Sequence, residues 1–209
     1  YKYILLITLK SITLIFLSIT FVQASNIKNS ATVFMYHKFG VSKYPSTSVT
    51  LDQFESHINE FIKGKYNILP LEFIIDTILN DGELPENTIG ISIDDADKSF
   101  FEVGWPIFKK NNIPVTLFVT TGTIAKNNKN YLNWDQIRKL KKEGVDIGAH
   151  SHTHAHMPDI SIEEAKKELE LSNQIFLKEI GQIPSLFAFP YGETSSELME
   201  LVKNFKFKV

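Results

Sequence analysis

The chain has 209 residues, 43% of them hydrophobic and 12% aromatic, which is enough to bury a core and favours a single domain. Its 22 basic and 24 acidic side chains give a net charge of −2 with no basic run that could follow a phosphate backbone, so we expect no nucleic-acid partner. No obligate protein partner is evident either. The absence of cysteine excludes disulfides and thiolate metal sites, so a transition metal would need histidine and carboxylate ligands.

The N-terminal segment predicts export. Residues 1–24 are mostly apolar with two lysines, and they end in Val22-Gln23-Ala24, a small-x-small cleavage pattern. We interpret them as a signal peptide, with an uncleaved membrane anchor as the alternative because about 20 apolar residues can span a bilayer. In both cases residues 25–209 would work in the periplasm or outside the cell.

The rest of the chain predicts strands and helices in alternation, in this order: a strand at 31–37, a helix at 51–64 capped by Thr50, a helix at 70–80, a strand at 88–93, a helix near 100–111, a strand at 115–119, a helix at 134–144, a strand at 145–149, a helix at 161–180, a strand at 185–190 and a helix that opens at Ser195 or Ser196. Strands separated by helices predict a parallel sheet, either a barrel or an open doubly wound sheet. Residues 204–209 alternate apolar and basic and resemble the start of another strand. Together with an opening Tyr1, this pattern suggests a fragment.

Polar residues follow the predicted strands at their carboxyl ends. His37, the pair Asp94-Asp95, His150 and Tyr191 each come just after a strand, and parallel α/β folds place their sites at that edge. Two adjacent carboxylates oppose each other's ionisation unless a cation relieves them. One could bind a metal while the other acts as a base, and we expect Asp97 to be a helix cap or to support the site from behind.

Four histidines, His150, His152, His154 and His156, alternate within seven residues. In an extended chain, side chains two residues apart share one face at about 7 Å, so His150 and His152 could bind one ion. If the chain curls after Ala149, residues four apart approach to about 6 Å and His150 with His154 becomes the better pair. Local sequence leaves both pairs open.

Three segments in order resemble the motifs of the polysaccharide deacetylases of carbohydrate esterase family 4, in particular the exported bacterial type with an early Tyr-His. They are Ser92-Ile93-Asp94-Asp95-Ala96, His150-Ser151-His152-Thr153-His154 and Ala188-Phe189-Pro190-Tyr191, with Tyr36-His37 upstream. The likeness covers about residues 31–203.

The resemblance implies a distorted (β/α) barrel, incomplete in this chain, and a divalent metal, usually zinc, held by Asp95, His150 and His154. It implies that Asp94 is the general base and that the backbone N–H of Tyr191 binds the oxyanion. The expected activity is removal of N-acetyl groups from a surface or exported polysaccharide that contains N-acetylglucosamine. Further residues expected to contact substrate or to support the site are His37, Pro190, His152, His156 and Asp97.

The chain departs from the family pattern at several positions. Ala96 replaces the glycine of the first motif, and Ala188 stands where the family has an arginine that orients the base. The motif with the family's catalytic-acid histidine would lie beyond residue 209, so we expect this chain to bind zinc but to deacetylate poorly. Alternatives are a member that binds metal or glycan without turnover, an O-acetyl esterase on polysaccharide, and a His-x-His metal hydrolase of the amidohydrolase type. The last fits less well because its His-x-His ends the first strand.

Overall fold

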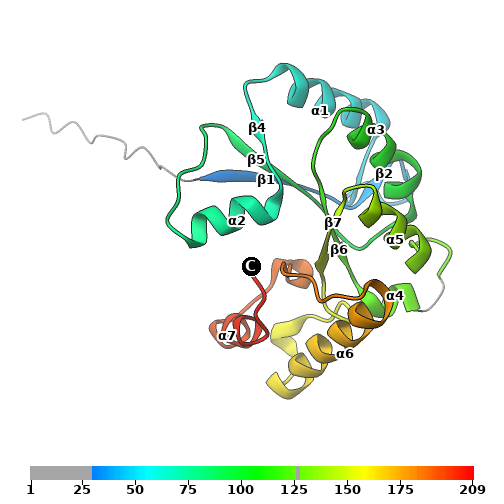
Figure 1. Ribbon diagram of the computed structural model, residues 1–209. Coiled ribbons are helices and arrows are strands. Elements are labelled where there is room, and N and C mark those ends of the chain that lie inside the picture. The colour runs from blue at the N-terminus through cyan, green and yellow to red at the C-terminus, as the bar shows by residue number, and fades with distance from the viewer. Residues whose placement is uncertain (1–29, 126–127) are drawn as a thin grey trace, which may run out of the picture.

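The computed structural model describes residues 30–125 and 128–209 (Figure 1). The expected signal at 1–24 lies outside these residues. Within the described part of the chain, no helix combines the length and the apolar composition needed to cross a bilayer.

A parallel sheet forms the centre of the molecule, which confirms the predicted α/β class. Its strands lie in the order β1 (Ala31–Tyr36), β5 (Thr88–Ile93), β6 (Thr116–Val119) and β7 (Asp146–Ala149). A short strand, β4 (Asn67–Ile68), pairs with the first residues of β5, while β6 pairs with the last ones. The sheet does not close into a barrel over the described residues, in keeping with an incomplete barrel. Because the strands of this sheet are parallel, all their carboxyl ends lie at one edge.

Two helices begin directly after the capping residues that the sequence predicted for them. Thr50 caps α1 (Leu51–Lys63) and Ser195 caps α7 (Ser196–Asn204), each by accepting a backbone N–H with its hydroxyl oxygen. The other helices near prediction are α2 (Leu71–Leu79), α5 (Trp134–Lys142) and α6 (Ile162–Ile180).

The predicted helix at 100–111 is correct in place but not uniform. A π-helical turn occupies Phe100–Gly104, and the α-helix α3 follows at Trp105–Lys110 with Pro106 in its first turn. Short elements without a strong periodic signal were not predicted, namely a separate pair of strands β2 (Lys38–Phe39) and β3 (Ser48–Val49), the strand β4, the helix α4 (Thr121–Ala125) and single 3₁₀ turns at Met157–Asp159 and Pro190–Gly192.

The predicted strand at 185–190 is wrong as a regular element. Only two isolated parallel bridges form there, between Ala149 and Phe187 and between Leu186 and Lys208. Pro190 has no N–H to donate and already belongs to the following 3₁₀ turn, so pairing stops before it. The segment nevertheless lies beside β7, and this places Ala188 next to the histidine run.

Aromatic side chains fill the core between the sheet and the helices α1 and α3. The rings of Tyr36, Phe39, Phe54 and Phe108 contact one another at centroid distances from 4.8 to 6.1 Å. Every residue of β5 is buried. Burial on both faces fits a strand whose only polar side chains are the small hydroxyls of Thr88 and Ser92, and it anchors the residues that follow β5.

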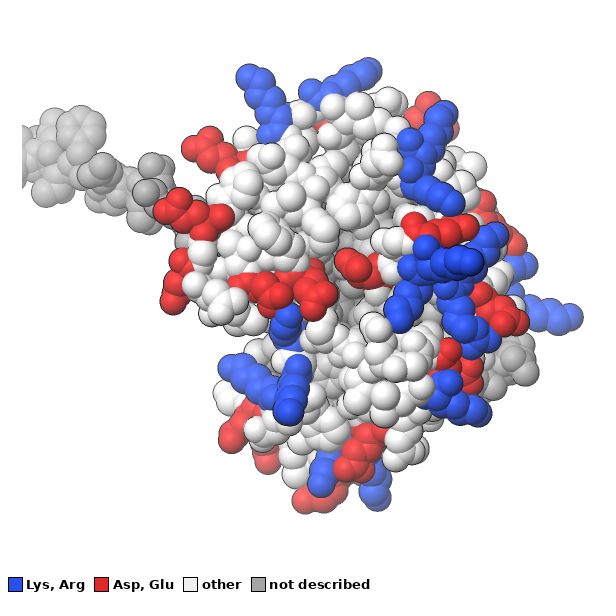
Figure 2. All heavy atoms as spheres, in the orientation of Figure 1, with Lys and Arg blue, Asp and Glu red and all other residues white. Residues whose placement is uncertain are grey.

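Charged side chains of both signs are interspersed on the face drawn in Figure 2 and form no continuous basic surface there.

Candidate metal centre and active site

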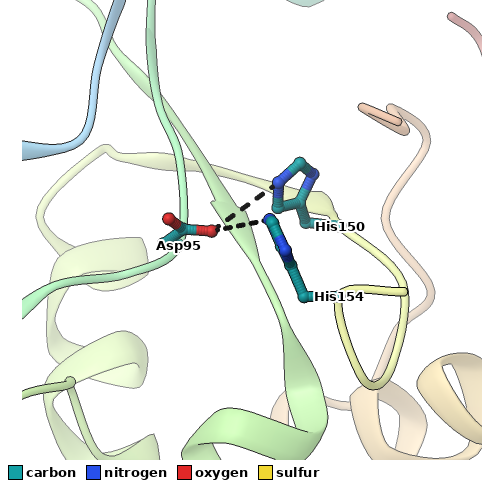
Figure 3. Close-up of side chains that lie close together, drawn as sticks. All are labelled: Asp95, His150 and His154. Atoms are coloured by element: carbon teal, nitrogen blue, oxygen red, sulfur yellow. Dashed lines mark ion pairs between the residues drawn. The ribbon is translucent and has the colours of Figure 1, made fainter. Parts of the chain in front are cut away.

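Asp95, His150 and His154 come together at the carboxyl edge of the sheet. Their potential ligand atoms lie within 4.8 Å of one another, and both imidazoles approach one carboxylate oxygen of Asp95 (Figure 3). Asp95 Oδ1 is 3.1 Å from Nε2 of His154 and 3.7 Å from Nε2 of His150. Neighbouring ligand atoms around one zinc ion, each about 2.1 Å from the metal, are separated by distances similar to the two given for Asp95. The donor set therefore fits a divalent metal.

The chain curls after β7, and the curl decides which histidines meet. Ser151 and His154 both adopt left-handed backbone conformations, with φ of 59° and 63°. The backbone N–H of His154 donates to the Ser151 hydroxyl over 3.0 Å. His154 consequently turns back toward His150, and their ring centroids are 4.9 Å apart.

Glu168 on α6 braces this curl from behind. Its carboxylate accepts the backbone N–H groups of His152 and Thr153 over 2.9 and 2.7 Å and the Thr153 hydroxyl over 2.8 Å. Glu168 is buried. Sequence reasoning missed this residue, because no spacing rule connects a helix carboxylate to a loop 15 residues earlier.

His152 and His156 point to partners other than the Asp95 cluster. The Nδ1 atom of His152 pairs with the hydroxyl of Thr121 over 3.0 Å. The Nδ1 atom of His156 lies 2.7 Å from the carboxylate of Glu193. The four alternating histidines thus divide into one pair that faces Asp95 and two that support the surrounding loops.

His150 is held as a neutral imidazole. Burial lowers its pKa to about 4, against a smaller opposing effect of its hydrogen bond to the carbonyl of Ala188. Because Nδ1 donates to that carbonyl over 2.8 Å, the lone pair of Nε2 faces Asp95. Histidines that bind metals are commonly oriented by this kind of contact. The backbone of Ala188 thus orients a histidine, although its side chain lacks the expected guanidinium.

The two adjacent carboxylates have different environments. Burial, and then the charge of Asp95, raise the pKa of Asp94 to about 7. Asp94 Oδ1 is buried without a hydrogen-bond partner among the described residues. Burial also opposes ionisation of Asp95, but the hydrogen bond and charge of His154 lower its pKa overall. Asp95 is therefore an ionised carboxylate that can bind a cation, and Asp94 is a carboxyl group that titrates near neutral pH.

Tyr191 lies over the site between two imidazoles. Its ring is 4.5 Å from that of His154 in an edge contact and 3.8 Å from that of His156 in a parallel stack. Its backbone is left-handed, with φ of 59°, and its side chain is exposed, whereas the preceding Pro190 is buried.

His37 and Asp97 are placed differently. His37 lines the same cavity as Asp94 and Asp95, and burial lowers its pKa. Asp97 instead accepts the backbone N–H and the hydroxyl of Ser99 with Oδ1 over 2.9 and 2.6 Å. It therefore holds the start of the turn that follows.

A cavity of about 880 Å³ has a polar part of its lining that comprises His37, Asp94, Asp95, His150, His154 and Tyr191. Its remaining wall is largely apolar and includes Val33, Ile74 and Phe187. Left-handed non-glycine residues gather at its polar end, at Asp95, Ala96, Ser151, His154 and Tyr191. Backbone strain of this kind costs about 1–3 kcal/mol per residue and is typical of functional sites.

Comparisons with known proteins identify a family and a shared fold. The family model described as polysaccharide deacetylase matches residues 81–209. A poly-beta-1,6-N-acetyl-D-glucosamine N-deacetylase of Staphylococcus aureus (strain MRSA252) is 27% identical over 198 residues, which cover 87% of this chain and 66% of that protein. The chain thus spans just under two thirds of that relative's length.

Two solved structures share the fold. The Streptococcus pyogenes deacetylase PplD, in complex with acetate, superposes with a TM-score of 0.78 at 21% identity, covering 88% of this chain and 82% of that one. IcaB from Ammonifex degensii gives a TM-score of 0.76 at 19% identity, covering 86% and 82%.

Proposed function

The chain belongs to the polysaccharide deacetylase family, and on that premise we propose that it is a metal-dependent hydrolase that removes N-acetyl groups from an exported or cell-surface polysaccharide containing N-acetylglucosamine. The observation that carries the proposal is the cluster of Asp95, His150 and His154 beside the buried carboxyl group of Asp94. The name of the Staphylococcus aureus relative supports the choice of substrate.

In this proposal Asp95, His150 and His154 hold a divalent ion, with zinc the best match to two imidazoles and one carboxylate. When bound, such an ion polarises an acetyl carbonyl and lowers the pKa of water. Asp94 takes the proton of the attacking water, because its pKa near 7 makes it a base at working pH, and it returns this proton to the leaving amine nitrogen as the C–N bond breaks. The backbone N–H of Tyr191 stabilises the developing oxyanion, and His37 contacts the sugar.

Two further residues support the proposed site. Pro190 fixes the turn that presents Tyr191, and His156 stacks on the ring of Tyr191. His152 helps to fix the curl of the histidine run through Thr121. Residues 1–24 would direct the protein out of the cytoplasm, and the proposed polysaccharide substrate is found outside the cytoplasm.

A second candidate function is metal or glycan binding with little turnover. It is favoured by the alanine at position 188 and by the buried Asp94 Oδ1, which has no cationic or hydrogen-bonding partner in the described chain. If packing alone orients Asp94, its carboxylate is poorly aligned with the attacking water and proton transfer to it is inefficient.

Acetate release separates these functions. The full chain is incubated with β-1,6-linked N-acetylglucosamine oligomers, after chelation and after addition of zinc, cobalt or magnesium. We expect slow release that needs the metal and that falls by at least a hundredfold in Asp94→Asn. Zinc binding without release from any oligomer would favour the binding function. Faster release from O-acetylated xylan than from the oligomers would instead indicate an esterase.

A further inference from the structure

A second hollow opens beside the cavity of the metal centre. It has a volume of about 270 Å³, and three residues, Met35, His37 and Thr47, line both spaces. His37 therefore stands at the junction between the metal centre and this hollow. A ligand that continues past His37 would enter it directly.

The lining of the hollow is polar but uncharged. It includes the hydroxyl residues Ser46, Thr47 and Ser48, the imidazoles of His37 and His57, and the ring of Tyr36. None of the described side chains that line it is a carboxylate, an ammonium or a guanidinium group. Hydroxyl and imidazole groups beside a few apolar atoms suit a neutral ligand rich in hydroxyls, which needs both hydrogen bonds and an apolar surface for its ring.

His57 is prepared for a ligand by Tyr36. The phenol oxygen of Tyr36 lies 2.9 Å from Nδ1 of His57. Burial raises the pKa of Tyr36 to about 12, so the phenol keeps its proton and can donate it to Nδ1. A neutral imidazole that accepts at Nδ1 carries its own proton on Nε2. In the described chain Nε2 has no hydrogen-bond partner, so this donor remains available.

We propose that the hollow binds the sugar residue next to the one whose acetyl group is at the metal centre, with His57 donating from Nε2 to a sugar hydroxyl. The proposal rests on the proposed function, since a polymeric substrate must extend beyond the reacting sugar. Tyr36 acts as a positioning residue, because its hydrogen bond to Nδ1 fixes the ring of His57.

The test compares substrates of different length. We measure kcat/KM for a β-1,6-linked N-acetylglucosamine tetramer and for the methyl glycoside of the single sugar. In His57→Ala the advantage of the tetramer should fall about tenfold, the loss expected for one hydrogen bond to a ligand. Tyr36→Phe keeps the buried ring and should reduce the same ratio less. Glu55→Ala, an exposed position on the same helix, is the matched control and should keep the ratio.

An unchanged ratio in a folded His57→Ala protein, verified by circular dichroism, would overturn the proposal. A second readout does not require turnover. Calorimetric binding of the N-acetylated tetramer to metal-free protein, which keeps the ligand neutral, should weaken in His57→Ala and stay unchanged in Glu55→Ala. If the wild type releases no acetate from any substrate, the proposed function fails, but the calorimetry still tests the hollow. Weaker tetramer binding in His57→Ala than in the wild type would support the hollow as a sugar site. No tetramer binding by the wild type would overturn it.

Discussion

Glu168 holds Thr153 at two points, accepting its backbone N–H over 2.7 Å and its hydroxyl over 2.8 Å. One buried carboxylate on α6 thereby fixes the loop that carries His150 and His154. Glu168 thus supports the proposed metal centre through His152 and Thr153, without a hydrogen bond to His150 or His154 among the described residues.

Glu168→Ala is expected to loosen the curl of the histidine run. Removal of the acceptor breaks three part-buried hydrogen bonds, which should lower the free energy of unfolding by roughly 2–3 kcal/mol. Zinc affinity should fall about tenfold, as for residues that orient metal ligands. Denaturant unfolding and calorimetric zinc titration measure the two effects. Glu170→Ala, an exposed carboxylate on the same helix, is the control, and equal losses in both variants would contradict the role given to Glu168.

Metal affinity should separate the histidines within the run. His154→Ala removes a group 3.1 Å from Asp95 and should weaken zinc binding by at least about a hundredfold, since even residues behind the ligands cost 10–100-fold. His152→Ala removes the same side chain two positions away, where it pairs with Thr121, and should cost far less. Zinc titration with a competing chelator measures both constants. Were His152→Ala the more damaging change, the extended pair of His150 and His152 would be the better choice.

The sequence predicted where the site lies better than it predicted the groups that hold the site residues in place. Asp95 and His150 were found because each follows an apolar strand, and parallel strands end at one edge. Spacing alone left His152 and His154 open, because the curl depends on left-handed residues that are not glycine. Glu168 was missed for lack of a local signal. The carbonyl of Ala188 was also missed, since a backbone acceptor has no signature in sequence.

The failed strand at 185–190 has a similar physical cause. Phe187 and Phe189 favour a strand, but Pro184 and Pro190 bound a segment too short for a continuous ladder. The helices were predicted more reliably, because caps such as Thr50 and Ser195 act within one turn of chain.

Ala96 stands in a left-handed conformation, with φ of 58°, where the family motif has glycine. Ala96→Gly should relieve about 1–2 kcal/mol of strain. It should also lose about 0.8 kcal/mol of methyl burial and about 0.4–1 kcal/mol of chain entropy. The net change in unfolding free energy should stay below about 1 kcal/mol. Ala165→Gly, equally buried but inside α6, gains no relief and should cost roughly 2 kcal/mol. Equal costs in denaturant unfolding would show that position 96 stores no strain.

Asp94 should make the stability of the metal-free protein depend on pH. Its pKa is about 7 in the folded chain, raised by burial and then by Asp95, against about 3.9 in an unfolded chain. Below pH 4 both states hold the proton, and above pH 7 both have lost it. Between these values only the unfolded state ionises, so this residue lowers the free energy of unfolding as pH rises, by up to about 1.4 kcal/mol per pH unit.

Asp94→Asn removes this titration. The variant should match the wild type near pH 4 and exceed it by roughly 2–4 kcal/mol at pH 8, measured by urea unfolding in the presence of a chelator. Ser92→Ala, a buried polar change two residues earlier on β5, should shift stability by a similar amount at both pH values and serves as the control. A stability difference between Asp94→Asn and wild type that does not change with pH would mean that Asp94 is ionised throughout this range, and that its carboxylate is solvated or paired in solution.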